Sequence, residues 1–299
     1  MKDFVTVVVL IIFLVLLVVG LSYSFTYLRS TTGSTQGLFL PPNISSPFTS
    51  TGAPLTIPEA DLWRGVGTDM TSSPYKGLVI LDTFEDGTSY TEPADEYVTI
   101  RASVDATEAV NVTGWSLESL VSKTRIFLPY GTVLYSDINQ NPVTDVYIAP
   151  GEFIYVVSGF SPIKTSFHTN TCSGYLNNGN AIIPDLPNVC PEPRTYLPAT
   201  IENVRNYGEQ CIEYVHSLAP CETPYTPAMT ELIPACRAFI EKTFNYTSCV
   251  ASTYPKETFS FFNRGGWYLY LNSRAELWRS NYEVIRLLDE RGRVVDVMK

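Results

Sequence analysis

The sequence predicts a mainly β fold, in which an antiparallel β-sandwich carries a disulfide-rich helical insertion and follows an N-terminal transmembrane helix. Three observations predict this. Short β-branched or aromatic runs alternate with turn residues between about residues 77 and 157, and again after residue 266. All six cysteines fall between residues 172 and 249. An uncharged apolar run occupies most of the first thirty residues.

The N-terminal segment is long enough to cross a bilayer. The run FVTVVVLIIFLVLLVVGL (4–21) carries no charge, and its apolar character extends to Leu28. A membrane span needs about 20 apolar residues, whereas the apolar region of a signal peptide has only about 7–15. A cleaved signal peptide is the rival interpretation, but Ser22-Tyr23-Ser24 is a poor cleavage site. We therefore interpret residues 1–29 as an uncleaved, single-pass anchor, with the membrane as its partner.

The segment that follows the anchor, residues 30–74, is rich in Ser, Thr, Pro and Gly and shows little periodicity. This composition is typical of an extended linker. We predict a stalk that holds a folded domain, residues 75–299, away from the membrane surface.

Short runs rich in β-branched and aromatic residues predict the strands, and Asp-Gly, Asn-Pro and Pro-Gly pairs separate several of them. In VNVTGWSL (110–117) the apolar residues change face at Gly114, where a bend is expected, so we place Trp115 and Leu117 in the core. Trp267 is predicted to be buried as well. The predicted strands are 77–84, 96–102, 109–117, 124–128, 132–134, 146–148, 152–157, 266–271, 277–278, 283–288 and 294–297.

The region 160–262 interrupts this β pattern. Prolines and cysteines come first, and two stretches with apolar residues at helical spacing follow, Ala199–Ser217 and Pro227–Phe244. We predict that these two helices are joined by a short, Pro-rich turn and pack antiparallel as an αα-hairpin.

The six cysteines indicate the compartment. An even number confined to one segment is typical of structural disulfides in an oxidising environment, so we place the bulk of the chain outside the cytoplasm. Buried thiols in a reduced protein are the alternative. A zinc site is a second rival, but the chain has no Cys-x2-Cys pair.

The predicted hairpin selects one set of disulfide pairs. In an antiparallel hairpin the start of the first helix lies beside the end of the second, which favours nested pairing. The expected bonds are therefore Cys221–Cys236 near the turn and Cys211–Cys249 at the open end, with Cys172–Cys190 by elimination. We expect this rigid hairpin to be a contact surface for a partner.

Five motifs occur in order along the two β regions: Glu-Tyr-Val (96–98), Val-x-x-x-Gly-Trp-x-Leu (110–117), Leu-Pro-x-Gly-Thr (128–132), a Pro-Gly pair before an apolar strand (150–157), and E-V-I-x-L-L-D-x-x-G-x-V-V-D (283–296). Together they resemble the lamin tail domain, an immunoglobulin-like β-sandwich. The resemblance covers roughly 75–160 and 263–299 and implies that Trp115 packs in the core. The anchor and the cysteine-bearing insertion depart from the family and suggest a bacterial surface protein.

Acidic residues cluster before and within the second predicted strand. A calcium site is one interpretation, because calcium takes oxygen ligands from loops, and a solvated turn is the other. The spacing does not match an EF-hand loop. The calcium candidates are Asp82, Glu85, Asp86 and Asp95, and Glu92 and Glu96 belong to the same cluster.

The remaining chemistry is sparse. A formal charge of −10 argues against nucleic-acid binding. The chain has no Gly-x-Ser-x-Gly elbow and no Gly-rich phosphate loop, and its two histidines, His168 and His216, are interpreted as structural. We predict no catalytic residues, no cofactor and no metal beyond the calcium candidates.

Two function classes follow. The first is a non-enzymatic, membrane-anchored and surface-displayed interaction or structural protein with a protein or surface-polymer partner. The second is a cell-surface hydrolase, or a hydrolase accessory, that acts on envelope or nucleic-acid substrates. Two convergent carboxylates or a metal in a deep cleft would favour the hydrolase, and a flat or aromatic-rimmed surface would favour binding.

Overall fold

The computed structural model describes residues 57–66, 72–82, 87–225, 229–254, 262, 265–278 and 283–299. All of them belong to the unit Pro54–Lys299. The predicted anchor and most of the predicted stalk lie outside the described residues, so both stay predictions. No helix in the described part of the chain has the length and apolarity that a membrane crossing requires.

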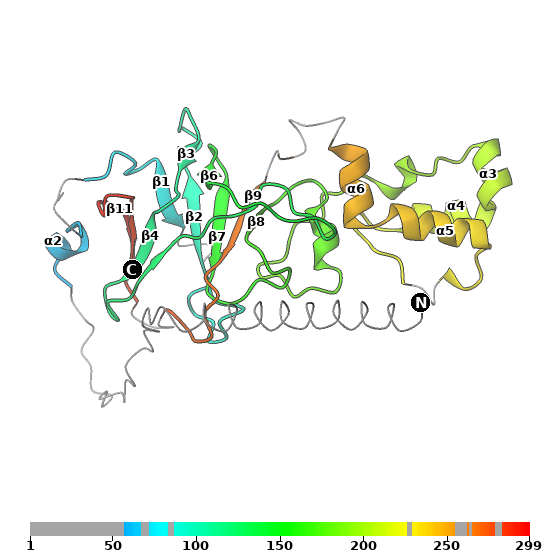
Figure 1. Ribbon diagram of the computed structural model, residues 1–299. Coiled ribbons are helices and arrows are strands. Elements are labelled where there is room, and N and C mark those ends of the chain that lie inside the picture. The colour runs from blue at the N-terminus through cyan, green and yellow to red at the C-terminus, as the bar shows by residue number, and fades with distance from the viewer. Residues whose placement is uncertain are drawn as a thin grey trace, which may run out of the picture. The chain divides into compact units, whose positions relative to one another are not determined.

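Two mostly antiparallel sheets contain most of the described strands (Figure 1). The first has the order β1–β2–β7–β9–β8, the second has the order β11–β10–β4–β5, and β3 pairs separately with β6. This arrangement confirms a β-rich chain with mainly antiparallel pairing. The strands are β1 (Val79–Asp82), β2 (Tyr97–Ala102), β3 (Val110–Asn111), β4 (Ser116–Ser119), β5 (Arg125–Phe127), β6 (Tyr147–Ile148), β7 (Phe153–Val157), β8 (Phe167–His168), β9 (Gly266–Tyr270), β10 (Ile285–Leu288) and β11 (Val294–Met298).

One pair of neighbouring strands, β7 and β9, is parallel, with Phe153 opposite Gly266 and Val157 opposite Tyr270. Parallel neighbours need a long crossover, because the chain must return to the same end of the sheet before it pairs again. The cysteine-rich region predicted as an insertion, 160–262, forms this crossover. The chain leaves the first sheet after β7, contributes the edge strand β8 from within this region, and returns as β9 beside β7.

Strand β9 (GWYLY) is buried along its whole length and serves two apolar cores. Trp267 and Leu269 belong to the core between the two sheets, which also contains Trp115. Tyr268 and Tyr270 point to the opposite face and join the core of the cysteine-rich region. Since side chains alternate along a strand, one strand links the two cores.

The bend expected at Gly114 is present. Gly114 has φ +80°, a conformation that costs glycine little, and the Trp115 N–H donates to the Val112 carbonyl at 3.1 Å. The turn separates β3 from β4 and directs Trp115 inward, where its side chain is fully buried and its ring lies 5.1 Å from that of Tyr75. Leu117, on β4, is also fully buried.

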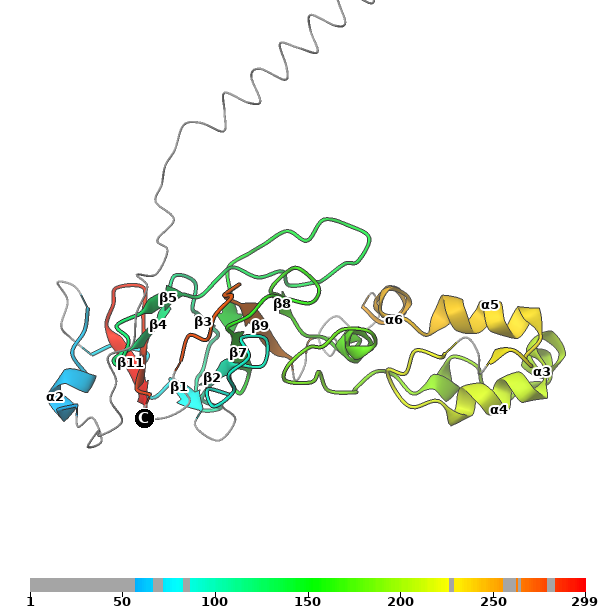
Figure 2. The same ribbon diagram turned by 90° about the horizontal axis from the view of Figure 1, so that it is seen from below.

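The cysteine-rich region consists of short helices around its own apolar core (Figure 2). The single predicted helix 199–217 is divided in two by Gly208, which has φ +81°. The predicted helix 227–244 begins later and ends at Thr243, and a further helix follows that the sequence analysis does not predict. The helices are η1 (Ser173–Asn177), η2 (Pro193–Thr195), α3 (Ile201–Tyr207), α4 (Glu209–Ser217), α5 (Pro234–Thr243) and α6 (Tyr246–Thr253).

All six cysteines are paired, but the three predicted pairings (172–190, 211–249 and 221–236) are wrong. The bonds are Cys172–Cys249, Cys190–Cys221 and Cys211–Cys236. The predicted nesting requires an antiparallel hairpin. In the structure α4 and α5 begin at the same end, so the Cα atoms of Cys211 and Cys236 lie 5.8 Å apart (Figure 2).

Two local features account for the different pairing. The connection between α4, which ends at Ser217, and α5, which begins at Pro234, is longer than the short loop of an αα-hairpin. The second feature is Asn245, whose side chain accepts from the Ser248 N–H and caps the new helix α6. Cys249 thereby belongs to α6 instead of the end of α5, and it bonds to Cys172 at the start of η1.

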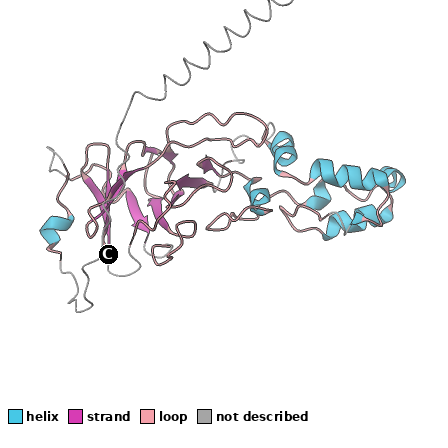
Figure 3. Ribbon diagram, turned by 60° about the horizontal axis from the view of Figure 1, so that its bottom comes forward, coloured by secondary structure: helices cyan, strands magenta, loops and turns pink. Residues whose placement is uncertain are grey.

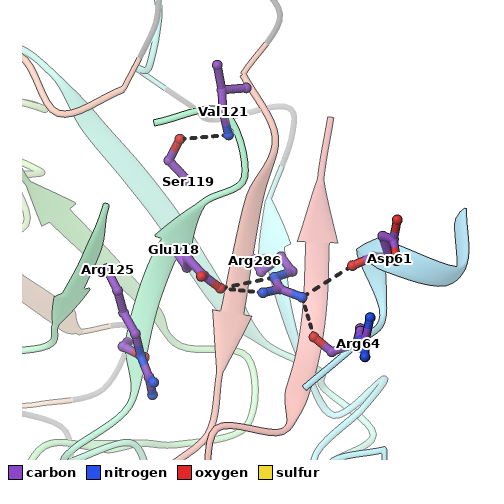
Figure 4. Close-up of polar contacts among 8 residues, drawn as sticks. Asp61, Arg64, Glu118, Ser119, Val121, Arg125 and Arg286 are labelled. Carbon is purple, nitrogen blue, oxygen red and sulfur yellow. Dashed lines mark hydrogen bonds and ion pairs between the residues drawn. The ribbon is translucent and has the colours of Figure 1, made fainter. Parts of the chain in front are cut away.

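Part of the predicted stalk packs on the second sheet through Arg286 of β10 (Figure 4). The Arg286 side chain is buried and pairs with Glu118 of β4, with Nε 3.2 Å from Oε2. Its Nη1 donates to the main-chain carbonyls of Asp61 and Arg64. The packed part of the chain therefore begins before residue 75, in the short helix α2 (Glu59–Leu62).

The C-terminal hairpin β10–β11 completes this attachment. The Val66 N–H donates to the Gly292 carbonyl at 2.8 Å, and Gly292 has φ +77°. A Cβ at Gly292 would lie 2.2 Å from the Val66 carbonyl oxygen, so only glycine allows this approach. Segment 57–66 is thus held to the hairpin by main-chain contacts as well as by Arg286.

Candidate functional site

A polar groove of about 750 Å³ lies between the loops of the strand region and the helical region. Its lining comes from segments 135–143, 162–165, 175–180 and 245–246, together with Thr223; we call it the junction groove. None of its lining residues lies in a strand. Figure 3 shows loops between the strands and the helices of the cysteine-rich region. The volume is within the range of small-molecule sites.

One wall of the groove, the loop 135–141, is held in shape by its own side chains. Asn141 Oδ1 accepts from the Ser136 N–H at 2.7 Å, and Asn141 Nδ2 donates to the Ser136 carbonyl at 2.9 Å. The Ser136 hydroxyl oxygen accepts from the Asn139 N–H at 3.0 Å. These short-range bonds are the local ordering that Asn and Ser provide in turns.

The same loop is attached to α6. The Tyr246 hydroxyl donates to the Tyr135 carbonyl at 3.1 Å and accepts from Asn170 Nδ2 at 3.1 Å. The Thr247 hydroxyl donates to Asp137 Oδ1 at 2.6 Å. The Cys172–Cys249 bond joins α6 to η1, which forms another wall. The walls are therefore held together before any ligand binds.

Three tyrosines contribute rings to the groove. The rings of Tyr135 and Tyr246 lie 5.6 Å apart and are tilted by 47°. Burial, followed by the Asp137 charge, raises the pKa of Tyr135. Burial, with a smaller effect of Tyr196, raises the pKa of Tyr175 to about 12. Burial also raises the pKa of Tyr246. All three phenols are therefore protonated at neutral pH and can donate as well as accept hydrogen bonds.

Several polar groups in the groove have hydrogen-bonding capacity left for a ligand. Within the described part of the chain, the Tyr135 hydroxyl and the Asn139 side chain make no hydrogen bond. Asn178 Nδ2 donates to the carbonyls of Tyr175 and Cys221, which fixes the amide and leaves its Oδ1 as an acceptor. Lys164 is exposed at the rim. The groove thus offers neutral donors and acceptors beside one cation.

The calcium candidates do not assemble into a site among the described residues. Asp82 is buried and lies 2.8 Å from Arg101 Nε, so its carboxylate already has a cationic partner. Asp95 is half-buried, and no group of three or more acidic, Cys or His residues suited to a metal occurs in the described ranges. Glu85 and Asp86 lie outside the described residues.

Glu96, from the same acidic cluster, has a structural role. It is fully buried, and its carboxylate accepts from the N–H groups of Leu277 and Trp278, each at 2.9 Å. Burial raises the pKa of Glu96, although these hydrogen bonds act in the opposite direction. The carboxylate therefore holds the segment 277–278 against β2.

The two histidines also make hydrogen bonds within the protein. His168 is buried, its Nδ1 donates to the Thr169 carbonyl at 2.7 Å, and its Nε2 lies 3.4 Å from Glu152 Oε1. Its ring lies edge-on to Trp267 at 4.9 Å. His216 Nε2 donates to the Leu197 carbonyl at 2.9 Å.

None of the residues of the junction groove is predicted as a site from the sequence. Two signals were present, the Asn-rich stretches SDINQN (136–141) and NNGN (177–180). Each is typical of a turn, so neither points to a ligand by itself. The groove forms because the crossover brings the two stretches together, and this proximity depends on the tertiary fold.

Comparison with protein-family models, with curated proteins and with solved structures finds no match to this chain. The structure accordingly establishes a β-rich domain with several sheets and three disulfides.

Proposed function

We propose that this chain is a non-enzymatic, membrane-anchored interaction protein that displays a ligand-binding domain on the outside of a cell, and that the cell is bacterial. The observation that carries the proposal is the junction groove, a preformed polar cavity with hydrogen-bonding groups that the described residues leave free. The anchor is the predicted span 1–29, and the partner is a surface polymer.

The placement outside the cytoplasm is supported by the three disulfides, which indicate an extracytoplasmic domain. Two of them join segments more than thirty residues apart, so they stabilise the tertiary fold of the crossover. A single-pass anchor followed by a stalk would hold this domain at the cell surface.

We further propose that the two sheets form an immunoglobulin-like, lamin-tail-like domain. Supporting this, the Gly-Trp motif directs Trp115 into the core between the sheets, and the closing motif 283–296 coincides with the hairpin β10–β11. The crossover between β7 and β9 is then an elaboration of that domain, and the junction groove belongs to the elaboration.

The scarcity of carboxylates in the groove favours binding over hydrolysis. Glycoside cleavage needs two convergent carboxyl groups, and metal-assisted hydrolysis needs a cluster of metal ligands. Among the described residues that line the groove, Asp137 is the sole carboxylate, and its Oδ1 already accepts from Thr247. The arrangement can hold a polar ligand, and it offers no acid–base pair to that ligand.

A blocking substitution tests this proposal. The full chain in lipid nanodiscs should bind envelope polymer from its source cells and release no soluble fragments from it. Asn139→Trp should abolish the binding, because the indole fills a cavity to which Asn139 contributes without internal hydrogen bonds. Asn188→Trp is the matched control, since Asn188 is exposed and does not line the groove.

Two results would contradict the proposal. Equal binding by wild type and Asn139→Trp would show that the groove is not the binding site. Steady release of fragments, measured by mass spectrometry of the supernatant, would show that the chain is a hydrolase.

A further inference from the structure

We propose that the junction groove binds a neutral oligosaccharide, as a segment of the surface polymer; this inference rests on the proposed function and names its ligand class. The charge of the groove, the hydrogen-bonding groups of its walls, its rings and its fixed shape support this ligand class.

The charges of the groove favour a neutral ligand. Lys164 and Asp137 are the two ionised side chains among its described lining residues, and they are of opposite sign. The Asp137 carboxylate is engaged by the Thr247 hydroxyl. One exposed lysine is too little for a phosphate-rich ligand, which is recognised by clusters of Arg and Lys, and the chain carries a net charge of −10.

The hydrogen-bonding groups match sugar hydroxyls. A sugar hydroxyl both donates and accepts, so its site needs groups of both kinds close together. Asn139 offers an amide with a donor and an acceptor, the Tyr135 hydroxyl offers both, and Asn178 Oδ1 offers an acceptor. A purely apolar ligand would leave these groups without partners and would bind at a cost.

The rings and apolar side chains of the groove supply the apolar contacts that a sugar site also needs. The C–H faces of a sugar ring are apolar and pack against aromatic and aliphatic side chains. Tyr135 and Ile163 are half-buried in the lining, which also contains the buried Leu176 of η1. A groove lined by such side chains and by amides can therefore contact the apolar faces of the ligand as well as its hydroxyls.

A peptide is a poorer match for this geometry. Extended peptides add to an open strand edge, and helical peptides need an apolar groove. The junction groove contains no strand residue, and amides and hydroxyls predominate in its lining.

The shape of the groove is fixed before binding, which reduces the entropy lost on association. Asn141 holds the loop 135–141, Thr247 attaches that loop to α6, and Asn178 is held by the carbonyls of Tyr175 and Cys221. The free atoms of the site are therefore borne by residues whose main chain is ordered.

The test is isothermal titration of the full chain, in nanodiscs or a detergent without a sugar headgroup. The neutral probes are tetrasaccharides of glucose, mannose, galactose and N-acetylglucosamine. Tetragalacturonate and a Gly-Ser-Asn peptide represent anionic and peptide ligands. We expect at least one neutral tetrasaccharide to bind and the other two probes not to bind.

Two conservative variants locate the site. Asn139→Ala and Tyr135→Phe should each weaken the binding about fivefold, as expected for the loss of one hydrogen bond, without a change in melting temperature. Asn188→Ala and Tyr130→Phe remove the same groups from exposed positions outside the groove and should bind as wild type does.

The outcomes separate this inference from the proposed function. Envelope binding that Asn139→Trp abolishes, without binding of any neutral tetrasaccharide, would overturn the ligand class and leave the surface-binding function intact. Tighter binding of tetragalacturonate or of the peptide would overturn it as well. Absence of envelope binding by the wild-type chain would overturn the proposed function itself.

Discussion

Replacing Trp115 by Ala should lower the free energy of unfolding by about 3–5 kcal/mol, the range for a large aromatic residue removed from a packed core. The Trp115 side chain is 0 % exposed and lies among residues from both sheets. The loss would leave a cavity that the surrounding strands cannot fill. Urea denaturation of the full chain, followed by far-ultraviolet circular dichroism, measures the effect.

Phe127→Ala provides the control, because Phe127 is an aromatic residue of the second sheet that is 59 % exposed. Its replacement should change stability by less than about 0.5 kcal/mol. A loss below about 1 kcal/mol at Trp115 would mean that the indole is not part of the core. It would contradict the role of the Gly-Trp motif in directing Trp115 inward.

Removing the Cys172–Cys249 bond should have a comparable effect. The bond closes a loop over a sequence separation of 77 residues, so the chain-entropy relation gives a loss of about 4.5 kcal/mol for the double variant Cys172→Ala/Cys249→Ala. The bond Cys211–Cys236 spans 25 residues and should cost about 3.5 kcal/mol when removed in the same way.

The two double variants should also differ in binding. Cys172–Cys249 joins η1 to α6, and both contribute to the junction groove, so its loss should weaken ligand binding as well as stability. Cys211–Cys236 joins α4 to α5, neither of which lines the groove. Equal binding by the two variants would contradict the role of the Cys172–Cys249 bond in shaping the groove. Non-reducing peptide mapping of wild type must first show these pairs.

Most of the strands could be predicted from the sequence because their signal is local, but the predicted strands 132–134 and 277–278 are not strands in the structure, and β8 (Phe167–His168) was not predicted. Alternation places Trp267 and Leu269 on one face of β9, and a glycine turn reorients Trp115 within a few residues. The parallel pairing of β7 with β9 could not be predicted in the same way. It depends on the path of the whole crossover, to which no local pattern points.

The disulfide pairing was mispredicted for a related reason. Helical spacing indicates that residues 199–217 and 227–244 are helical, but it does not show that α4 and α5 begin at the same end or that Asn245 starts a new helix. The first feature brings Cys211 beside Cys236, and the second places Cys249 on α6. Cysteines assumed to lie on an antiparallel hairpin were therefore paired with the wrong partners.

The junction groove was missed because its residues are unremarkable in sequence. Asn139 and Asn178 look like ordinary turn residues, and they lie in a bend and a turn respectively. They matter for binding because both line the same cavity. That position is created by the crossover and by the Cys172–Cys249 bond, both of which are tertiary features.

Hydroxyl-radical footprinting of the full chain on envelope polymer tests most directly the claim that the junction groove is the binding surface. Binding should reduce the oxidation of Tyr135 and Ile163, which are half-buried in the groove, and leave the exposed Phe127 and Tyr147 unchanged. Protection of Phe127 and Tyr147, with Tyr135 and Ile163 oxidised as in the free chain, would place the partner on the sheets and contradict the account.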